Sequence, residues 1–451
     1  MSVERILLKG GCVLTLDPDI GNYSKGDVLI EDNKIAAVGP QLRVSGAEVI
    51  DATNTIVMPG FIDTHRHIWE GILKNIAPDA LLDEYFRDIL GVLAPVYRPQ
   101  DAYAGNLVSA LGAIDCGVTT LLDWSHIQNT PEHTDAAIAA LQESGLRSVF
   151  AYGTPNLDMV AWWHNSSLKH PHDVKRVQKQ YFNSDDQLIT LALAPRGPEF
   201  TTFDVSKHDW ELARELGIRI SVHVGVGAAG QHGKLGEFGR AGMMGPDTTY
   251  IHCCTLNDEE LQMIADTGGT VSIAAPVEMQ MGHGMPPVQR CIDRGMKPSL
   301  SVDVETTVST DLFAQMRSVL TLQRAQINEM RLAGKDNLPA VLTSRDVMEF
   351  ATIEGARAMG LDSKIGTLTP GKEADVIMLR TDRINVLPIN DPIGVVVRGM
   401  DSSNVDSVFI AGKARKRRGQ LVDVDINRVR RIAYESRDYV VETSGFRMPE
   451  I

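Results

Sequence analysis

The sequence predicts an α/β protein, in which a (β/α)8 barrel of the TIM type is joined to a small β-sandwich built by both ends of the chain. Three observations lead to this prediction. Short apolar segments alternate with helical patterns through the middle of the chain. Short β-patterned segments with turn residues occupy both ends. Histidines and an aspartate stand where several of the central apolar segments end.

Each of eight central apolar segments is short and is followed by turn residues, as expected for a buried strand of a parallel sheet. These segments are 55–63, 118–124, 146–153, 188–195, 218–225, 248–254, 269–276 and 297–305. Patterns typical of amphipathic helices lie between several of them, at 131–145, 204–217, 257–268 and 287–295. This alternation of strand and helix predicts the barrel.

The β-patterned segments at the two ends of the chain predict the sandwich. They are 6–17, 26–39, 47–55, 365–380, 405–416 and 420–425. We therefore expect a first part of the sandwich, the barrel, a second part of the sandwich and a helical tail, at 1–56, 57–364, 365–423 and 424–451.

Composition restricts the classes of partner. The net charge of −14 disfavours binding to a nucleic-acid backbone. We interpret the one basic run, 412–419, as a solvated hairpin loop between two strands. The sequence contains no run of about 18 apolar residues, so it predicts no membrane-spanning helix. We thus expect a small-molecule substrate, with neither nucleic acid nor membrane as partner.

The cysteines and the N-terminus favour a cytoplasmic protein. The five cysteines are odd in number and form no C-x-x-C pair, which is typical of reduced thiols. The N-terminal segment has a strand pattern and lacks the apolar core of a signal peptide.

The segment "MPGFIDTHRHIWEG", residues 58–71, holds the first candidate metal ligands. Side chains alternate faces along a strand, so His65 and His67 point the same way and Arg66 points the other way. An H-x-H pair taken alone is weak support for a metal, and other ligands must come from elsewhere in the chain.

Three further polar residues end apolar segments of the predicted barrel: His223, His252 and Asp303. Functional residues of such barrels gather at the carboxyl ends of the strands. Five polar residues at one rim are hard to explain as packing alone. Three imidazoles and one carboxylate suit a zinc-like ion that keeps a position open for water.

The chain resembles the amidohydrolase superfamily, in the branch of cytosine, guanine and adenosine-type deaminases and chlorotriazine hydrolases. The resemblance runs over nearly the full length, and its most specific motifs are "MPGFIDTHRH", "SVHVG", "IHCCTLNDEEL", "SVDVETTVS" and the late "PGKEADVIML". It implies a metal-dependent hydrolase of non-peptide carbon–nitrogen bonds, and a homodimer or homotetramer. Relatives that have lost their metal ligands are not enzymes, and this non-catalytic role is a further alternative.

The resemblance also implies a ligand set and a cofactor. The implied metal ligands are His65, His67, His223 and Asp303. We expect one divalent ion, with zinc first and iron or manganese as alternatives. Members with two ions use a carboxylated lysine on the fourth strand, where this chain offers Arg196 and no lysine.

A mechanism follows from the bound ion. A divalent metal lowers the pKa of its water from about 16 towards about 7, which supplies hydroxide near neutral pH. Asp303 would take the proton of that water and pass it to the leaving nitrogen. His252 would stabilise the developing oxyanion and contact the substrate.

One position departs from the ring deaminases of the family. Their fifth strand usually reads His-x-x-Glu, and this glutamate protonates a ring nitrogen, whereas here Val226 stands at that place. We therefore favour an amide, urea or carbamate-like substrate, which needs no ring protonation. The alternative is a deaminase or dechlorinase of an N-heterocycle, with Glu199 or Glu278 as the acid.

Several residues near the predicted rim are candidate substrate contacts. Besides His252, they are His126, Trp69, Glu70, Arg196, Glu199 and Glu278. Trp162, Trp163 and the methionines of "VEMQMGHGM" could form the floor of an apolar pocket.

Overall fold

The protein is described by a computed structural model that covers residues 4–184 and 186–448. Within these residues the chain divides into two compact units. The first unit contains the sheet built by the chain ends, and the second contains the candidate site. The first consists of 4–63, 112–120 and 311–424; the second of 64–111, 121–184, 186–310 and 425–448.

The central strands form an eight-stranded sheet in the order β13-β12-β11-β10-β9-β8-β7-β6. The strands are β6 (Phe61–Arg66), β7 (Val118–Ser125), β8 (Arg147–Tyr152), β9 (Ile189–Leu193), β10 (Arg219–Val224), β11 (Thr248–His252), β12 (Thr270–Ile273) and β13 (Ser299–Leu300). Six of them fall within the predicted segments, and β6 and β7 begin in theirs and extend past them, by three residues and by one. The strand pairings from β8 to β13 are parallel.

Hydrogen bonds between the two end strands of this sheet nearly close it into a barrel. Just after β13, Asp303 pairs with Arg66 of β6 in a parallel bridge. The Asp303 amide donates to the His65 carbonyl over 3.0 Å, and the His67 amide donates to the Asp303 carbonyl over 2.9 Å. The predicted (β/α)8 barrel is confirmed.

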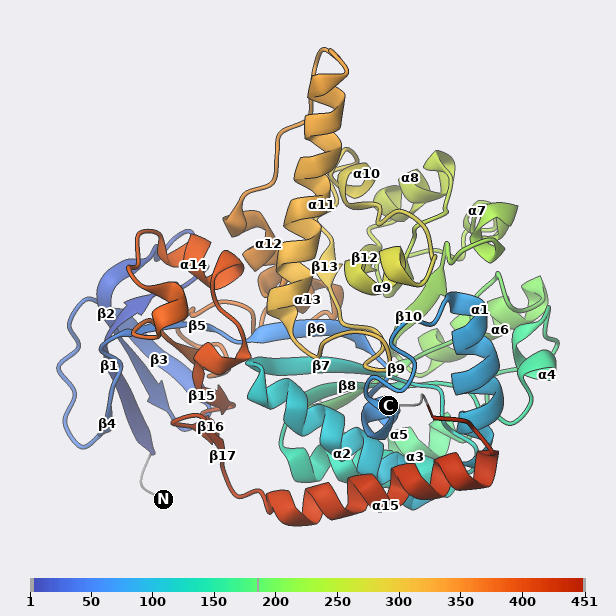
Figure 1. Cartoon of the computed structure of the whole chain (residues 1–451), viewed down its shortest axis with the longest axis horizontal. Coiled ribbons are helices and arrows are strands. Elements are labelled where there is room, and N and C mark those ends of the chain that lie inside the picture. Colours follow the sequence, from blue (N-terminus) through green and yellow to red (C-terminus); the bar gives the residue numbers. More distant parts are fainter. Residues whose placement is uncertain (1–3, 185, 449–451) are drawn as a thin grey trace. The chain divides into compact units, whose positions relative to one another are not determined.

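Helices connect the barrel strands, as Figure 1 shows. Those between strands are α2 (Pro99–Asp115), α3 (Pro131–Ser144), α4 (Met159–Trp163), α5 (Val174–Tyr181), α6 (Phe203–Glu215), α7 (Lys234–Arg240), α8 (Asp258–Asp266), α9 (Ala275–Gln280) and α10 (Val288–Ile292). The helices between the last barrel strand and the C-terminal helix are α11 (Leu312–Leu332), α12 (Ser344–Phe350), α13 (Ile353–Ala358) and α14 (Pro392–Arg398).

The second unit has an apolar core beside the candidate site. The loop after β6 contributes η1 (Ile68–Leu73), and α1 (Leu82–Glu84) leads into η2 (Tyr85–Leu93) and η3 (Ala94–Val96). Trp69, Ile89 and Leu93 pack in one buried cluster with Val440 of the C-terminal helix α15 (Ile426–Ser444). This packing holds η1 in place, and η1 begins at Ile68, directly after His67 of the candidate site.

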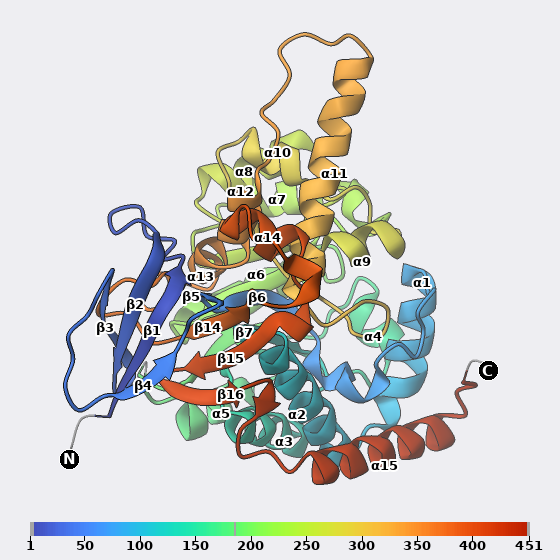
Figure 2. The same ribbon diagram turned by 60° about the vertical axis from the view of Figure 1, so that its left-hand side comes forward.

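The two ends of the chain pair within one sheet, drawn in blue and red in Figure 2. Its strands are β1 (Arg5–Val13), β2 (Tyr23–Glu31), β3 (Lys34–Gly39), β4 (Glu48–Asp51), β5 (Thr55–Pro59), β14 (Val376–Arg380), β15 (Val405–Ile410), β16 (Lys413–Arg417) and β17 (Gln420–Leu421). β5 runs antiparallel to β14, which joins the first part of the chain to the last.

The interpretation of the basic run as a loop is wrong. Residues Lys413–Arg417 form strand β16, which pairs with β15 and with β17. Lys416 is buried, and its ammonium lies 2.7 Å from Asp115 Oδ1. The alternation of the strand thus turns one cation inward, where a carboxylate neutralises it.

Among the described residues, no helix is long and apolar enough to cross a membrane. All five cysteines lie in the described part of the chain, and none of them forms a disulfide.

Candidate active site and metal centre

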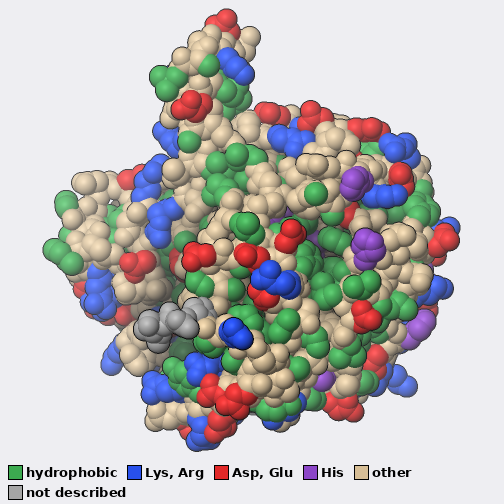
Figure 3. Space-filling view, turned by 45° about the vertical axis from the view of Figure 1, so that its right-hand side comes forward, with side chains coloured by type: hydrophobic (Ala, Val, Ile, Leu, Met, Phe, Trp, Pro, Cys, Tyr) green, Lys and Arg blue, Asp and Glu red, His purple; other side chains and the backbone are tan. Residues whose placement is uncertain are grey.

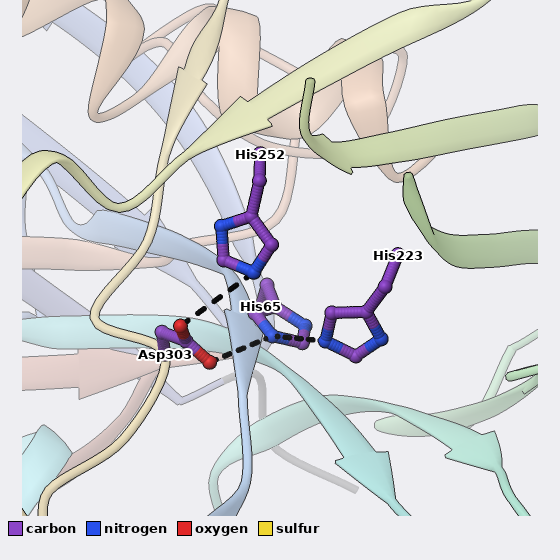
Figure 4. A group of neighbouring side chains, drawn as sticks. All are labelled: His65, His223, His252 and Asp303. Atoms are coloured by element: carbon purple, nitrogen blue, oxygen red, sulfur yellow. Dashed lines mark hydrogen bonds and ion pairs between the residues drawn. The ribbon is translucent and has the colours of Figure 1, made fainter. Parts of the chain in front are cut away.

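The carboxyl end of the barrel brings one aspartate and several histidines together, as Figure 4 shows for four of them. One ligand atom from each of His65, His223, His252 and Asp303 lies within 4.8 Å of the others. His65 Nε2 is 3.0 Å from Asp303 Oδ1 and 3.2 Å from His223 Nε2. The Nε2 atom of His67 lies 3.5 Å from the same Asp303 oxygen.

Two of these imidazoles, those of His67 and His223, are held in their neutral form. Burial lowers the pKa of His67 well below its ordinary value, and the neighbouring His126 and His65 lower it further. Burial, followed by His65 and His67, has the same effect on the pKa of His223. Neutral imidazole offers one nitrogen lone pair to a ligand.

The carboxylate of the cluster is held in its charged form. Burial acts to raise the pKa of Asp303, but the hydrogen bond with His65 and the charges of His252 and His65 hold that pKa far below its ordinary value. Two facing ring nitrogens 3.2 Å apart, beside a carboxylate, need a proton or a cation between them. The donor set therefore fits a divalent metal ion.

Hydrogen bonds on the far side of two rings aim their other nitrogens into the cluster. His67 donates from Nδ1 to the Trp124 carbonyl over 2.8 Å, which leaves the Nε2 lone pair facing Asp303. His252 Nδ1 lies 3.1 Å from Glu278 Oε1, and its Nε2 lies 3.6 Å from Asp303 Oδ2. Such partners orient metal ligands and catalytic histidines.

His252 differs electrostatically from the other rings because it lies between two carboxylates. Burial acts to lower its pKa, but the hydrogen bond with Glu278 and the charges of Asp303 and Glu278 outweigh burial, and the pKa is raised. This ring is therefore the best placed of the cluster to donate a hydrogen bond to developing negative charge.

Two residues of the cluster have a strained backbone. His252 has φ 72° and Asp303 has φ 70°, in the left-handed region that non-glycine residues seldom adopt. Strain of this kind costs about 1–3 kcal/mol and is found mainly at functional sites. Hydrogen bonds to neighbouring strands hold both turns, including Cys253 N to Val224 O at 2.9 Å.

A small cavity opens beside the cluster and is lined by several of its residues. Most of its wall is apolar. Its lining residues are His67, Leu82, Tyr85, Phe86, Leu90, His126, Trp163, Phe200, His223, Val226, His252, Met281, His283, Asp303 and Val304.

Of the predicted substrate contacts, His252 and His126 line this cavity. His126 is buried, and Trp69 Nε1 donates to its Nδ1 over 3.3 Å. The same nitrogen also lies 3.4 Å from the Trp124 carbonyl oxygen. Trp69 itself belongs to the apolar core and does not line the cavity.

Two of the predicted carboxylate contacts lie behind the cavity wall. Glu70 is buried and accepts a 2.5 Å hydrogen bond from the hydroxyl of Tyr85, which does line the cavity. Burial raises the pKa of Glu70 well above its ordinary value. Glu278 accepts from the Ala274 amide over 2.8 Å and bonds to His252.

The other two predicted contacts come from the turn after β9. Glu199 accepts a 2.6 Å hydrogen bond from the Gly225 amide, and burial raises its pKa to about 7. Arg196 donates to the carbonyls of Trp162, over 2.5 Å, and of Leu168. Neither side chain is part of the cavity lining.

Four aromatic lining residues were not expected from the sequence: Tyr85, Phe86, Phe200 and His283. The first two lie in η2, whose sequence "YFRDILGVL" alternates apolar and polar residues as any amphipathic helix does. Phe200 and His283 lie in turns without a periodic pattern. The aromatic pair in "DEYF", close behind the H-x-H segment, was the one available signal.

Comparison with known proteins identifies the family. The sequence model described as "Amidohydrolase family" matches residues 56–415. The chain is 29% identical over 431 residues to a 5'-deoxyadenosine deaminase of Methanothermobacter thermautotrophicus, covering 93% of this chain and 95% of the relative. It is 25% identical over 436 residues to a 5-methylthioadenosine/S-adenosylhomocysteine deaminase of Pyrococcus abyssi, covering 94% and 96%.

Solved structures share the fold. An adenosine deaminase from Xanthomonas campestris with bound zinc superposes with a TM-score of 0.81 at 20% identity, covering 97% of this chain and 98% of that one. An atrazine chlorohydrolase from Arthrobacter aurescens complexed with zinc also gives a TM-score of 0.81, at 21% identity, covering 96% and 100%.

The chain belongs to the amidohydrolase family. It is an enzyme, a metal-dependent hydrolase of carbon–nitrogen bonds other than peptide bonds. This confirms the predicted class of activity, and the non-catalytic alternative falls.

Proposed function

We propose that this enzyme hydrolyses an acyclic carbon–nitrogen bond in a small amide, urea or carbamate-like molecule. The observation that carries the proposal is Val226, which is 5% exposed and lines the cavity three residues after His223. Valine cannot supply the proton that attack on an aromatic ring requires. An acyclic substrate needs only one group that moves a proton from water to the leaving nitrogen.

The proposed holder of the metal is the set of His65, His67, His223 and Asp303. We propose one divalent ion, with zinc first and iron or manganese as alternatives; the two structures named above contain zinc. When bound, the ion supplies Lewis-acid activation of water near neutral pH. The segment 188–200 around β9 holds no lysine that could be carboxylated to bridge a second ion, and its Arg196 donates to two backbone carbonyls.

The residues of the site divide the proton transfers between them. The oxygen of the attacking water bonds to the carbonyl carbon, and Asp303 takes a proton from that water as the bond forms. His252, 3.6 Å from Asp303 Oδ2 through Nε2, donates a hydrogen bond to the carbonyl oxygen as negative charge develops there. Asp303 then passes its proton to the nitrogen as the C–N bond breaks, leaving an amine and a carboxyl or carbamate product.

A second candidate is the hydrolysis of an amino or chloro substituent on an N-heterocycle. The names of the relatives, deaminases of 5'-deoxyadenosine and an atrazine chlorohydrolase, favour it. The reaction would need an acid in place of Val226. Glu199 supports this candidate, since its pKa of about 7 keeps part of it protonated at neutral pH.

A substrate panel separates the two candidates. We expect the zinc-loaded enzyme to hydrolyse aryl ureas, N-acyl amines or carbamates and to leave aminated purines, pyrimidines and triazines unchanged. Efficient deamination of a ring by the unmodified enzyme would overturn the proposal. The Glu199→Gln and Glu278→Gln variants would then identify the acid.

We also propose that the enzyme works in the cytoplasm as a homodimer or homotetramer. Five cysteines without a disulfide support a reducing compartment. Light scattering during size-exclusion chromatography tests the oligomeric state, and a monomer would contradict it.

A further inference from the structure

Three aromatic side chains from different segments meet on one wall of the cavity. Phe86 comes from η2, Trp163 from α4 and Phe200 from the turn after β9. The ring centroids of Trp163 and Phe200 are 5.4 Å apart, and those of Phe86 and Trp163 are 6.3 Å apart, both with edge-to-face geometry. We call these three residues the aromatic wall.

The rest of the cavity offers few polar groups beyond the metal cluster. The neighbours of the aromatic wall include Leu82, Leu90, Met281 and Val304. Among the described lining residues, Asp303 is the one carboxylate, and there is no serine, threonine, asparagine, glutamine, lysine or arginine. Figure 3 likewise shows patches of hydrophobic side chains at the surface, with histidines among them.

Hydrogen bonds hold Trp163 of the aromatic wall in place. The buried guanidinium of Arg196 binds the carbonyls of Trp162 and Leu168, on either side of Trp163. Trp163 Nε1 donates to Asn156 Oδ1 over 3.3 Å, and Asn156 in turn donates to the His126 carbonyl over 2.8 Å. Preorganised side chains bind a rigid group without a further cost of ordering them.

We propose that the aromatic wall is a binding subsite for an uncharged aromatic ring carried by the substrate, and that the cavity excludes nucleosides. The proposal rests on the proposed function and names the substrate class of the same site. An aromatic ring gains area burial and edge or stacking contacts from the wall. The sugar of a nucleoside such as 5'-deoxyadenosine would bury two hydroxyls among apolar side chains, where they would lose their hydrogen bonds to water without replacement.

A binding experiment without turnover tests the subsite. Isothermal titration calorimetry on the zinc-loaded enzyme would compare 4-phenylbutan-2-one, the ketone counterpart of N-benzylacetamide, with butan-2-one and with 5'-deoxyadenosine. We expect the phenyl ketone to bind at least tenfold more tightly than butan-2-one. We expect no binding of the nucleoside.

Variants assign the binding to the aromatic wall. Trp163→Leu and Phe200→Leu should each lower the affinity for the phenyl ketone on the order of tenfold and leave the affinity for butan-2-one unchanged. The matched control is Phe203→Leu, since Phe203 is 40% exposed and lies three residues from Phe200 but outside the cavity lining. It should alter neither affinity.

Three results would overturn the assignment of the subsite. They are equal affinity for the two ketones, tight binding of 5'-deoxyadenosine, or variants that lose affinity for both ketones equally. Failure of the proposed function is seen separately, in the hydrolysis of N-benzylacetamide and benzylurea beside N-methylacetamide and methylurea. If binding depends on the ring but none of these four compounds is hydrolysed, the proposed reaction is contradicted and the assignment of the subsite stands. If the compounds are hydrolysed without preference for the ring, the proposed reaction is supported and the assignment of the subsite is contradicted.

Discussion

His252 depends on Glu278 for both its orientation and its charge. The hydrogen bond between them spans 3.1 Å, and both side chains are buried. We predict that Glu278→Ala lowers kcat by about 10–100-fold, the usual effect of removing such a partner, with little change in KM or metal content. Glu278→Gln should recover part of the loss, because its amide oxygen can still accept from Nδ1.

Steady-state kinetics with metal analysis of both Glu278 variants checks this prediction. Unchanged kcat in Glu278→Ala would show that His252 needs no partner. Loss of metal together with activity would instead make Glu278 a support of the metal centre.

Val226 decides which chemistry the cavity wall permits. A carboxylate at this position would face an apolar surface, and its pKa would rise so that it stays partly protonated. We predict that Val226→Glu lowers turnover of the native acyclic substrate and creates weak activity on an aminated or chlorinated N-heterocycle. Turnover assays on both substrate classes test this; improved turnover of the acyclic substrate would contradict it.

At the scale of elements, the turn after β9 is tied to the end of β10 by Glu199 and the Gly225 amide. The pKa of Glu199 is about 7 in the folded protein, above the ordinary value of 4.5, chiefly through burial. Between these two values the folded state binds more protons than the unfolded state. The free energy of unfolding therefore falls as pH rises through this window, and the effect is complete above about pH 7.

Urea unfolding of the wild type and of Glu199→Gln at pH 5 and pH 8 measures this contribution. We predict that the variant loses less stability than the wild type between the two pH values. Equal losses would mean that Glu199 does not titrate there.

The barrel strands could be predicted from sequence because each is a short apolar run that ends in turn residues. Six of the eight lie within the expected segments, and β6 and β7 run past the ends of theirs. The basic run 412–419 was wrongly predicted to be a loop because it is charged on both faces of the strand that it forms. The burial of Lys416 depends on Asp115, about 300 residues away in the sequence. Arg196 shows the same limit, because its two carbonyl partners, Trp162 in α4 and Leu168 in the connection after it, could not be predicted from its own segment.

The candidate metal cluster was predictable for a different reason. In a barrel, residues that end consecutive strands meet at one rim, so placing the strands also places His223, His252 and Asp303 together. The aromatic wall was not predictable to the same degree. Trp163 was a candidate, but Phe86 and Phe200 come from connections whose paths no strand register determines.

At the scale of the whole molecule, the fold should not depend on the metal. Each unit has its own buried apolar cluster, and a chain of this length buries enough surface to fold alone. We predict that removing the metal with a chelator abolishes activity and leaves the far-UV circular dichroism spectrum unchanged. Loss of the helical signal on chelation would show a structural metal, as in a zinc finger.

The central claim is that one divalent ion, held by four side chains at the barrel rim, carries the reaction. Its most direct test is the metal content of the purified wild type and of His65→Ala, His223→Ala and Asp303→Ala, measured by inductively coupled plasma mass spectrometry beside turnover. We predict about one ion per chain in the wild type, and loss of most metal and most activity in each variant, because losing one donor weakens such a site sharply. Full metal occupancy with normal turnover in Asp303→Ala would contradict the claim.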